Sequence, residues 1–221
     1  GTGASLYLRP LLIGINPVLG VKAATEAMLI IFASPVGAYF KEGIKPIKVV
    51  VDREQDRSAP RGTGDVKVGG NYASSILSGE HAHQLGYSNV LYLDSVERKY
   101  IEECGAANFF GIRDGLYVTP KSTSILPSIT NKSLRRLAAD LGLKVEERQV
   151  PVDELSLFTE CGACGTAAVI SPICKIVDLD TDKVYDFGDT VGEYSQKMYN
   201  MLQDIQYGRA EDKYGWTTIV A

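Results

Sequence analysis

The segment Arg61–Tyr72 holds four glycines around a single lysine, Lys67. Glycine lets a backbone turn tightly and lets a bulky ligand approach it closely. Val66 and Val68 flank the lysine. Apolar neighbours that exclude water from an amine favour its neutral, nucleophilic form, which condenses with aldehydes. The residues alone therefore leave two interpretations open, a nucleophilic lysine or a glycine-rich surface turn that carries a solvated one.

Short apolar or β-branched segments alternate with a few helix-like stretches along the chain, which favours an α+β (mixed α/β) fold over a doubly wound sheet. No Gly-x-Gly-x-x-Gly motif follows a strand and opens a helix, so a dinucleotide-binding domain is not supported. The expected strands are 6–13, 28–33, 47–51, 89–93, 116–119, 144–150, 173–177 and 183–185.

Three helices are expected, and each has its own signal. The first covers 71–85, with Tyr72, Ile76, Leu77 and Leu85 as its packed side. The second follows Pro127 and Ser128 and ends at Leu141, where Gly142 can form a left-handed cap. The third is expected to be capped by Asp189 and to bury a stripe of side chains, namely Tyr194, Met198, Met201, Leu202 and Ile205.

The charge of the chain narrows the range of partners. A net charge of -4 and a pI near 5.3 argue against nucleic acid and against anionic membrane, because both attract clustered Lys and Arg. The longest apolar run, 27–33, is too short to span a bilayer. A soluble cytoplasmic protein that acts on small molecules is therefore expected.

Four cysteines, Cys104, Cys161, Cys164 and Cys174, are too few for a disulfide framework in a chain of 221 residues and are expected to be reduced thiols. Cys161-x-x-Cys164 invites a zinc or redox interpretation. No second ligand pair accompanies it, and the only histidines, at 81 and 83, lie too close in sequence to share a helix face. No metal site is predicted.

Gly62-Thr-Gly-Asp-x-Lys67-x-Gly-Gly-Asn-Tyr72 resembles the cofactor-lysine segment of branched-chain amino acid aminotransferases. These are class IV pyridoxal-phosphate enzymes of fold type IV, and five segments of this chain match the family in order. The resemblance implies the end of a small N-terminal domain at 1–40, a linker at 41–46 and a large cofactor domain at 47–221. It also implies that about a third of the enzyme precedes residue 1, as the start Gly1-Thr-Gly-Ala-Ser, without Met, suggests.

The resemblance implies the residues that would hold pyridoxal 5'-phosphate. Lys67 would bond to the aldehyde, Tyr72 would contact the phenolic oxygen, and Glu103 would keep the pyridine nitrogen protonated. A helix N-terminus and a turn of small residues suit a phosphate group. The phosphate-binding residues would be Ile129 (through its N–H), Thr130 and Thr166. The neighbouring Glu102 is expected to be solvated, and Ala106 departs from the threonine that some members carry.

On the substrate side, the resemblance implies a pocket shaped by aromatic and basic side chains. Tyr7 and Arg9 share one face of a strand, and an arginine fork can bind the side-chain carboxylate of glutamate in two hydrogen bonds. The implied substrate-binding residues are Tyr7, Arg9, Tyr39, Thr166 and Ala167.

The implied reaction is amino-group transfer between leucine, isoleucine or valine and 2-oxoglutarate, carried out by a homodimer. Two alternatives share the fold, a D-amino acid aminotransferase and an aminodeoxychorismate lyase. Tyr7-Leu-Arg9 and Cys164-Gly-Thr-Ala-Ala168 favour the branched-chain enzyme. Alternatives of another class are a non-catalytic fragment and a thiol sensor or metal module built on Cys161 and Cys164.

Overall fold

The computed structural model describes residues 4–37 and 43–220. The chain divides into two compact units, Gly1–Gly43 and Ile44–Ala221, each of which is described by itself. The division lies within the stretch 41–46. Tyr39 lies outside the described residues.

The first unit is an antiparallel hairpin of β1 (Ser5–Gly14) and β2 (Ala27–Val36). The pairing runs without a shift from Ser5 opposite Val36 to Gly14 opposite Ala27. Apolar side chains of both strands are exposed within the unit, including Leu8 and Ile31. None of the buried apolar clusters of the described residues includes a side chain of this hairpin, and an isolated two-stranded hairpin is only marginally stable in water.

The second unit is built on a nine-stranded sheet that closes on itself. Six of its strands, β3, β4, β5, β6, β9 and β10, pair in a complete ring, while β11 extends from β10, and β7 and β8 extend from β6. The strands are β3 (Ile47–Asp52), β4 (Asn89–Leu93), β5 (Ile101–Cys104), β6 (Ala107–Arg113), β7 (Leu116–Pro120), β8 (Lys144–Arg148), β9 (Glu160–Gly165), β10 (Val169–Asp178) and β11 (Lys183–Asp186).

Parallel and antiparallel pairs are mixed in this sheet. β3 runs parallel to both β4 and β10, and β7 runs parallel to β8, whereas the other pairs are antiparallel. Buried side chains from strands all around the ring form one apolar cluster, which includes Val49, Leu91, Phe109, Ala163 and Ile173. The predicted mixed α+β fold is confirmed.

β9 was not among the predicted strands, because its sequence is made of small residues. A Cβ placed on Gly162 would lie 2.5 Å from the ring of Phe110 on the neighbouring strand β6. Glycine in a strand commonly marks such a close approach. Gly162 therefore weakens the sequence signal for a strand, yet the packing of Phe110 against β9 requires it.

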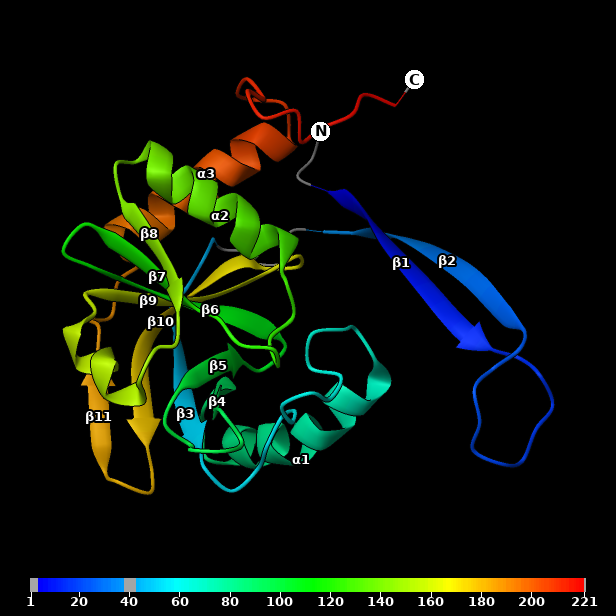
Figure 1. Ribbon diagram of the computed structural model, residues 1–221. Coiled ribbons are helices and arrows are strands. Elements are labelled where there is room, and N and C mark those ends of the chain that lie inside the picture. The colour runs from blue at the N-terminus through cyan, green and yellow to red at the C-terminus, as the bar shows by residue number, and fades with distance from the viewer. Residues whose placement is uncertain (1–3, 38–42, 221) are drawn as a thin grey trace. The chain divides into compact units, whose positions relative to one another are not determined.

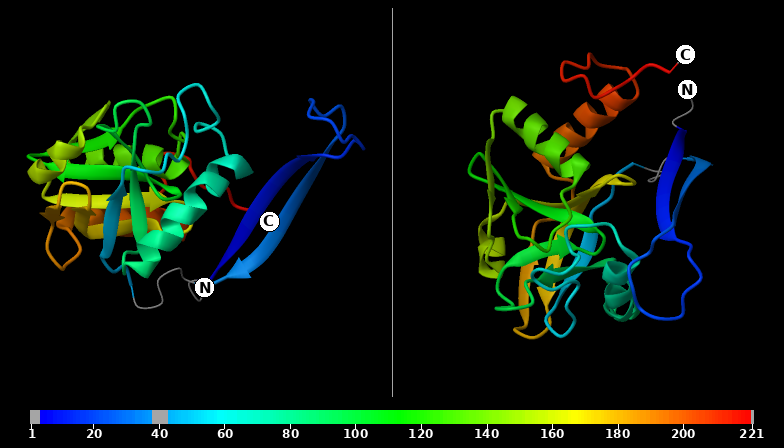
Figure 2. Two further views of the ribbon diagram at one scale, coloured as in Figure 1. Left: turned by 90° about the horizontal axis from the view of Figure 1, so that it is seen from below. Right: turned by 45° about the vertical axis from the view of Figure 1, so that its right-hand side comes forward.

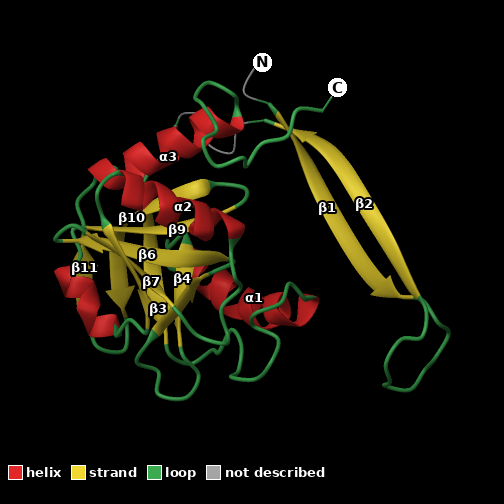
Figure 3. Cartoon of the chain, turned by 45° about the horizontal axis from the view of Figure 1, so that its top comes forward, coloured by secondary structure: helices red, strands yellow, loops and turns green. Residues whose placement is uncertain are grey.

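Three helices and one short 3-10 helix complete the second unit: α1 (Gly69–Gln84), α2 (Ile129–Asp140), α3 (Glu193–Gln206) and η1 (Val152–Leu157). The helices α2 and α3 lie side by side, and α1 lies on a different side of the sheet (Figures 1 and 2). The view in Figure 3 shows the strands crossing beneath α2 and α3. None of the helices in the described residues has the length and apolar character needed to cross a bilayer.

The ends of α2 are as predicted. The side chain of Ser128 accepts a hydrogen bond of 3.1 Å from the Asn131 N–H, and Gly142 has a φ of 84° just after the helix. In α3 the predicted buried stripe is confirmed, since Met198, Leu202 and Ile205 are buried. Both helices contribute to one apolar cluster against the sheet.

The predicted Asp189 cap is wrong. α3 begins at Glu193, and the carboxylate of Glu160 on β9 accepts hydrogen bonds from the backbone N–H groups of Tyr194 and Ser195 and from the Ser195 hydroxyl. A carboxylate at a helix N-terminus satisfies its unpaired N–H groups and its partial positive charge. This cap comes from 33 residues upstream of the helix, so no local motif reveals it.

The predicted packed side of α1 is also wrong. Ile76 and Leu77 are exposed, at 63% and 66%, whereas the buried positions are the small or polar Asn71, Ser78 and Ala82. Small side chains let the helix approach β3 and β4 closely, and the Ser78 and Tyr92 hydroxyls lie 2.5 Å apart. An apolar spacing alone therefore indicated the wrong face.

We expect Glu160→Ala to lower the free energy of unfolding by about 2 kcal/mol, because it removes the acceptor of three hydrogen bonds at the start of α3. The matched control is Glu193→Ala, which removes an exposed carboxylate of the same helix turn and should cost less than about 0.5 kcal/mol. Urea denaturation measures both, and equal losses would contradict the long-range cap.

Candidate active site

Lys67 lies at the end of the loop that leads from β3 into α1. Its Nζ donates a hydrogen bond of 2.7 Å to the hydroxyl of Tyr72, which is in the first turn of α1. Lys67, Val66 and Val68 are all exposed in this unit, so the two valines do not bury the amine. The predicted desolvation by its sequence neighbours is therefore not observed, although the lysine has a fixed hydroxyl partner.

The loop before Lys67 is held by a buried asparagine. The Asn71 amide donates to the carbonyl oxygens of Thr63 and Val66, at 2.6 and 2.8 Å, and its oxygen accepts from the Thr63 hydroxyl at 2.8 Å. Asn71, in the first turn of α1, therefore holds the carbonyl groups of Thr63 and Val66 and the hydroxyl of Thr63. This network limits the conformations available to the backbone that carries Lys67.

Only some of the glycines in this loop are required by packing. A Cβ on Gly64 would lie 2.2 Å from the carbonyl oxygen of Ser124, so this position brings two backbone segments together. Gly69 and Gly70 border open space, with no atom within 4 Å of a built Cβ. Their surroundings leave room for a group that approaches the backbone.

Glu103 lies on β5 with only 3% of its surface exposed. Its Oε2 is 2.9 Å from the Nη2 of Arg57, and its Oε1 accepts from the Leu126 N–H at 3.1 Å and from the Asn108 amide at 3.3 Å. Burial raises the pKa of Glu103 to about 7, although the positive charge of Arg57 and the Leu126 N–H act in the opposite direction. A carboxylate with such a pKa changes its ionisation easily near neutral pH.

The expectation that Glu102 is solvated is wrong. It is 4% exposed and accepts a hydrogen bond of 2.8 Å from the Ser122 hydroxyl, and burial raises its pKa. Successive side chains of a strand point to opposite faces, and both faces of β5 are covered. Two neighbouring glutamates are therefore buried in different surroundings.

The structure brings three of the predicted residues to one cavity. Lys67, Tyr72 and Glu103 line it, together with Arg57 and other residues of the second unit. The lysine amine, the tyrosine hydroxyl and the buried carboxylate therefore line the same cavity. Perturbed ionisable groups in a cleft are typical of functional sites.

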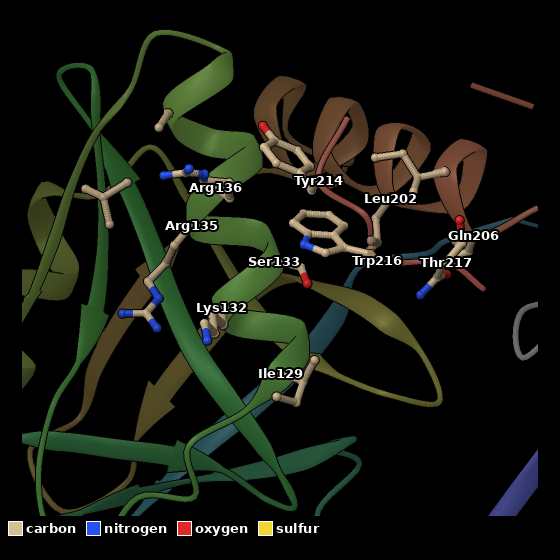
Figure 4. A pocket seen from close by; sticks show the side chains of 13 residues that line it. Ile129, Lys132, Ser133, Arg135, Arg136, Leu202, Gln206, Tyr214, Trp216 and Thr217 are labelled. Atoms are coloured by element: carbon tan, nitrogen blue, oxygen red, sulfur yellow. The ribbon is translucent and has the colours of Figure 1, made fainter. Parts of the chain in front are cut away.

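A larger cavity, of about 810 Å³, lies elsewhere, beside α2 and α3. Trp216 lies between these two helices, and its ring stacks on Tyr214 with 4.4 Å between ring centroids (Figure 4). Among the residues that the structure describes, no acidic side chain lines this cavity, and its charged side chains are Lys132, Arg135 and Arg136. Because it lacks a base paired with a nucleophile, we place the candidate active site at Lys67.

The predicted phosphate residues Ile129 and Thr130 form the first turn of α2. The first N–H groups of a helix have no partner within the helix, and the helix dipole favours an anion there. Ile129 is 76% exposed and Thr130 is half-buried. Phosphate binding by this turn, which the resemblance implies, stays a prediction.

Thr166 and Ala167 lie in the exposed turn between β9 and β10. The turn ends in an unusual backbone conformation, since Val169 has a φ of 62° and the Ile170 N–H donates to the Ala168 carbonyl at 2.8 Å. A β-branched residue rarely adopts positive φ, which costs of order 1–3 kcal/mol. Sequence reasoning did not identify Val169, and no sequence signal marks such strain.

Tyr7 and Arg9 belong to the first unit. The Arg9 guanidinium donates a hydrogen bond to the Tyr7 hydroxyl, and its carbon lies 5.3 Å from the centre of the tyrosine ring. The two side chains therefore share a face of β1, as their spacing predicts. Tyr39, the other predicted pocket residue of this part of the chain, lies outside the described residues.

The cysteines do not form a metal or redox site in the described part of the chain. All four are free and buried, and Cys161 and Cys164 face different apolar clusters on opposite sides of β9. Burial raises the pKa of both thiols. Among the described residues no three His, Cys, Asp or Glu side chains gather as metal ligands.

A family model described as "Amino-transferase class IV" matches residues 3–176. The chain belongs to the class IV aminotransferases. Curated members that it resembles include the branched-chain-amino-acid aminotransferases of Helicobacter pylori, 51% identical over 97% of this chain, and of Haemophilus influenzae, 48% identical over 98% of it. The chain spans 63% and 65% of the lengths of these two relatives.

Solved class IV aminotransferases share this architecture. A branched-chain amino acid aminotransferase from Thermobaculum terrenum, in its PLP-form, is 28% identical, with a TM-score of 0.80 over 96% of this chain and 68% of that chain. The branched-chain enzyme from Escherichia coli is 30% identical, with a TM-score of 0.76 over 96% of this chain and 68% of that chain.

We expect Gly64→Ala to lower the free energy of unfolding by about 2 kcal/mol, because the new methyl group displaces the Ser124 carbonyl. Gly69→Ala is the matched control, since its methyl group enters open space and should change stability by less than about 0.5 kcal/mol. Guanidinium denaturation compares the two variants. Similar stabilities would show that the two backbone segments do not meet at Gly64.

The ionisation of Glu103 should be visible in the pH dependence of stability of the protein without cofactor. The folded chain, with a pKa of about 7 at Glu103 against an ordinary value of 4.5, binds more protons than the unfolded chain between these pH values. The free energy of unfolding should therefore fall as the pH rises from about 4.5 to about 7, by up to about 3 kcal/mol from this group.

Glu103→Gln lacks this titration, while Arg57 stays charged in both proteins. We expect the stability difference between wild type and Glu103→Gln to change across the same pH window. The measurement is urea denaturation at intervals of half a pH unit. Parallel curves for the two proteins would be incompatible with a raised pKa at Glu103.

Proposed function

We propose that this chain is the cofactor-binding part of a pyridoxal-phosphate-dependent branched-chain aminotransferase. The enzyme transfers amino groups between leucine, isoleucine or valine and 2-oxoglutarate, giving branched 2-oxo acids and glutamate. The observation that carries the proposal is the convergence of Lys67, Tyr72 and the buried Glu103 at one cavity. The names of the relatives at 51% and 48% identity support the substrate class.

The residues present fit pyridoxal phosphate. Glu103 is a buried carboxylate with a raised pKa, suited to an acceptor role opposite a ring N–H, and the Tyr72 hydroxyl lies beside the lysine amine. Two related branched-chain amino acid aminotransferase structures contain pyridoxamine 5'-phosphate and N-(5'-phosphopyridoxyl)-L-glutamate. When bound, the cofactor supplies an electron-withdrawing ring that stabilises negative charge on the substrate α-carbon.

The chain's own residues would divide the remaining work. The Lys67 amine would hold the cofactor through its aldehyde carbon and, as a free amine, would move the proton at the substrate α-carbon. Glu103 would accept a hydrogen bond from the protonated ring nitrogen, and the Tyr72 hydroxyl would contact the phenolic oxygen. The phosphate is held by the α2 N-terminus and the β9–β10 turn, through Ile129, Thr130 and Thr166.

The substrate side of the proposal involves both units. Tyr7, Arg9 and Tyr39 would shape the pocket, with the Arg9 guanidinium binding the side-chain carboxylate of glutamate. The Thr166 and Ala167 amides would hold the α-carboxylate. The proposal further assigns residues 1–40 to a small domain, 47–221 to the large domain, a homodimer to the assembly and the cytoplasm to its location.

The other activities of this fold are less well supported. The curated relatives named above are branched-chain enzymes, which does not favour a D-amino acid aminotransferase or an aminodeoxychorismate lyase. Opposite placement of Cys161 and Cys164 likewise disfavours a thiol sensor or metal module. A substrate panel of L-leucine, D-alanine and aminodeoxychorismate, applied to the full-length protein, separates the three enzymes.

The test of the lysine is chemical trapping. Wild type and the exposed-lysine control Lys132→Ala are mixed with pyridoxal phosphate, reduced with borohydride and digested, and mass spectrometry locates the label. We expect one label on the peptide that contains residue 67, and its loss in Lys67→Ala. A stable label of the same amount in Lys67→Ala would overturn the assignment. The experiment is run on both the 221-residue chain and the full-length protein.

A further inference from the structure

Arg57 lies in the loop after β3, ten residues before Lys67, and only 7% of it is exposed. Its Nη2 is 2.9 Å from the Glu103 carboxylate, donates to the Ser124 carbonyl and lies 3.3 Å from the Ser58 hydroxyl. Its buried Nε has no hydrogen-bond partner among the described residues. A buried arginine of this kind is expensive to keep unless its charge has a use, because its desolvation is only partly compensated.

Two hydrogen bonds hold the loop that carries Arg57. Its backbone carbonyl accepts a hydrogen bond of 2.7 Å from the hydroxyl of Ser74 on α1. The Ser58 hydroxyl donates to the Ser124 carbonyl at 3.2 Å, which ties the same loop to the segment that follows β7. These bonds fix the backbone of the loop, while the guanidinium itself is held by the Ser124 carbonyl and the Glu103 carboxylate.

Glu103 uses its two oxygens for different partners. Oε2 faces Arg57, whereas Oε1 accepts from the Leu126 N–H and the Asn108 amide. The plane of the carboxylate is thus set by donors on two sides. Removing Arg57 would free Oε2 and leave the negative charge without its nearest cation.

Charge balance makes Arg57 the decisive neighbour. The charged or titratable groups that act on Glu103 or feel its charge are Arg57, Lys67, Glu102, Cys104 and Cys164. The two thiols are buried and neutral at physiological pH, and Glu102 adds negative charge. A lysine such as Lys67 is positively charged only when its amine is protonated, whereas an arginine side chain stays protonated.

We propose that Arg57 is a positioning residue that favours the ionised form of Glu103 and orients it, and thereby decides whether this carboxylate can hold a proton on the cofactor's ring nitrogen. The inference rests on the proposed function for its last step. The first step, control of Glu103 by Arg57, is a property of the chain without cofactor. The two steps can therefore be tested separately.

The first measurement is made without cofactor. Glutamate labelled with ¹³C at Cδ is incorporated, the Glu103 signal is identified by its loss in Glu103→Gln, and its pKa is read by NMR titration. We expect Arg57→Met to raise this pKa by at least about one unit, a tenfold change in proton affinity. Arg57→Lys should restore part of the shift because it keeps the charge but loses the guanidinium geometry. Arg61→Met, which removes an exposed arginine of the same loop, is the control and should leave the pKa unchanged.

An unchanged Glu103 pKa in folded Arg57→Met overturns the proposal. If Arg57→Met does not fold, Arg57→Lys decides, since the proposal requires a measurable rise there as well. Glu102→Gln gives an independent check of the same charge balance, and it should lower the Glu103 pKa because a like charge is removed.

The second measurement uses pyridoxal phosphate labelled with ¹⁵N in the ring, bound to the full-length protein. The ring nitrogen should be protonated at pH 7.5 in wild type and Arg61→Met, and deprotonated in Arg57→Met. Failure of wild type to bind the cofactor would refute the proposed function while leaving the ¹³C result intact. A protonated ring in Arg57→Met would refute the role of Arg57 even if the enzyme is an aminotransferase.

Discussion

The buried ion pair between Arg57 and Glu103 is the interaction on which the candidate site depends. β5 belongs to the closed ring of strands and all four of its residues are buried, so Glu103 is held within the sheet. Arg57, in contrast, comes from the loop that also carries Lys67. The pair therefore links a fixed sheet wall to the lysine loop, in a region where an uncompensated charge would cost several kcal/mol. This ion pair therefore joins the strand that carries Glu103 to the loop that carries Lys67.

The ring of strands supports the segments that carry the other predicted site residues. Loops and helix ends on the ring bring the Lys67 loop, the first turn of α2 and the β9–β10 turn to the second unit's surface, while the apolar cluster inside the ring holds the strands. Two glycines allow close packing in this unit, since a Cβ on Gly64 would collide with the Ser124 backbone and a Cβ on Gly162 with the Phe110 ring. Val169 adds a strained turn next to Thr166. Strain of this kind persists only where surrounding packing over-determines the backbone.

Local signals in the sequence predicted many of the elements and failed for identifiable reasons at others. A β-branched run predicted β3, and Ser128 with Gly142 predicted the two ends of α2, because propensity and capping act within a few residues. The wrong predictions involve long-range contacts. Glu160 replaces Asp189 as the cap of α3, and α1 buries Ser78 and Ala82 because close approach to β3 and β4 matters more there than apolar character.

The sequence by itself determined the chemistry available to this protein: a lysine in a glycine-rich loop, a tyrosine five residues later, a glutamate before a turn of small residues, and small turns suited to an anion. Residue types and spacings carry that information because backbone freedom and side-chain functional groups are local properties. Only the tertiary structure decided that Arg57 meets Glu103, that Glu102 is buried as well, and that Cys161 and Cys164 point apart. Those outcomes depend on which strands pair and which faces are covered, and burial, which sets the energy of a charge, exists only once the chain has folded.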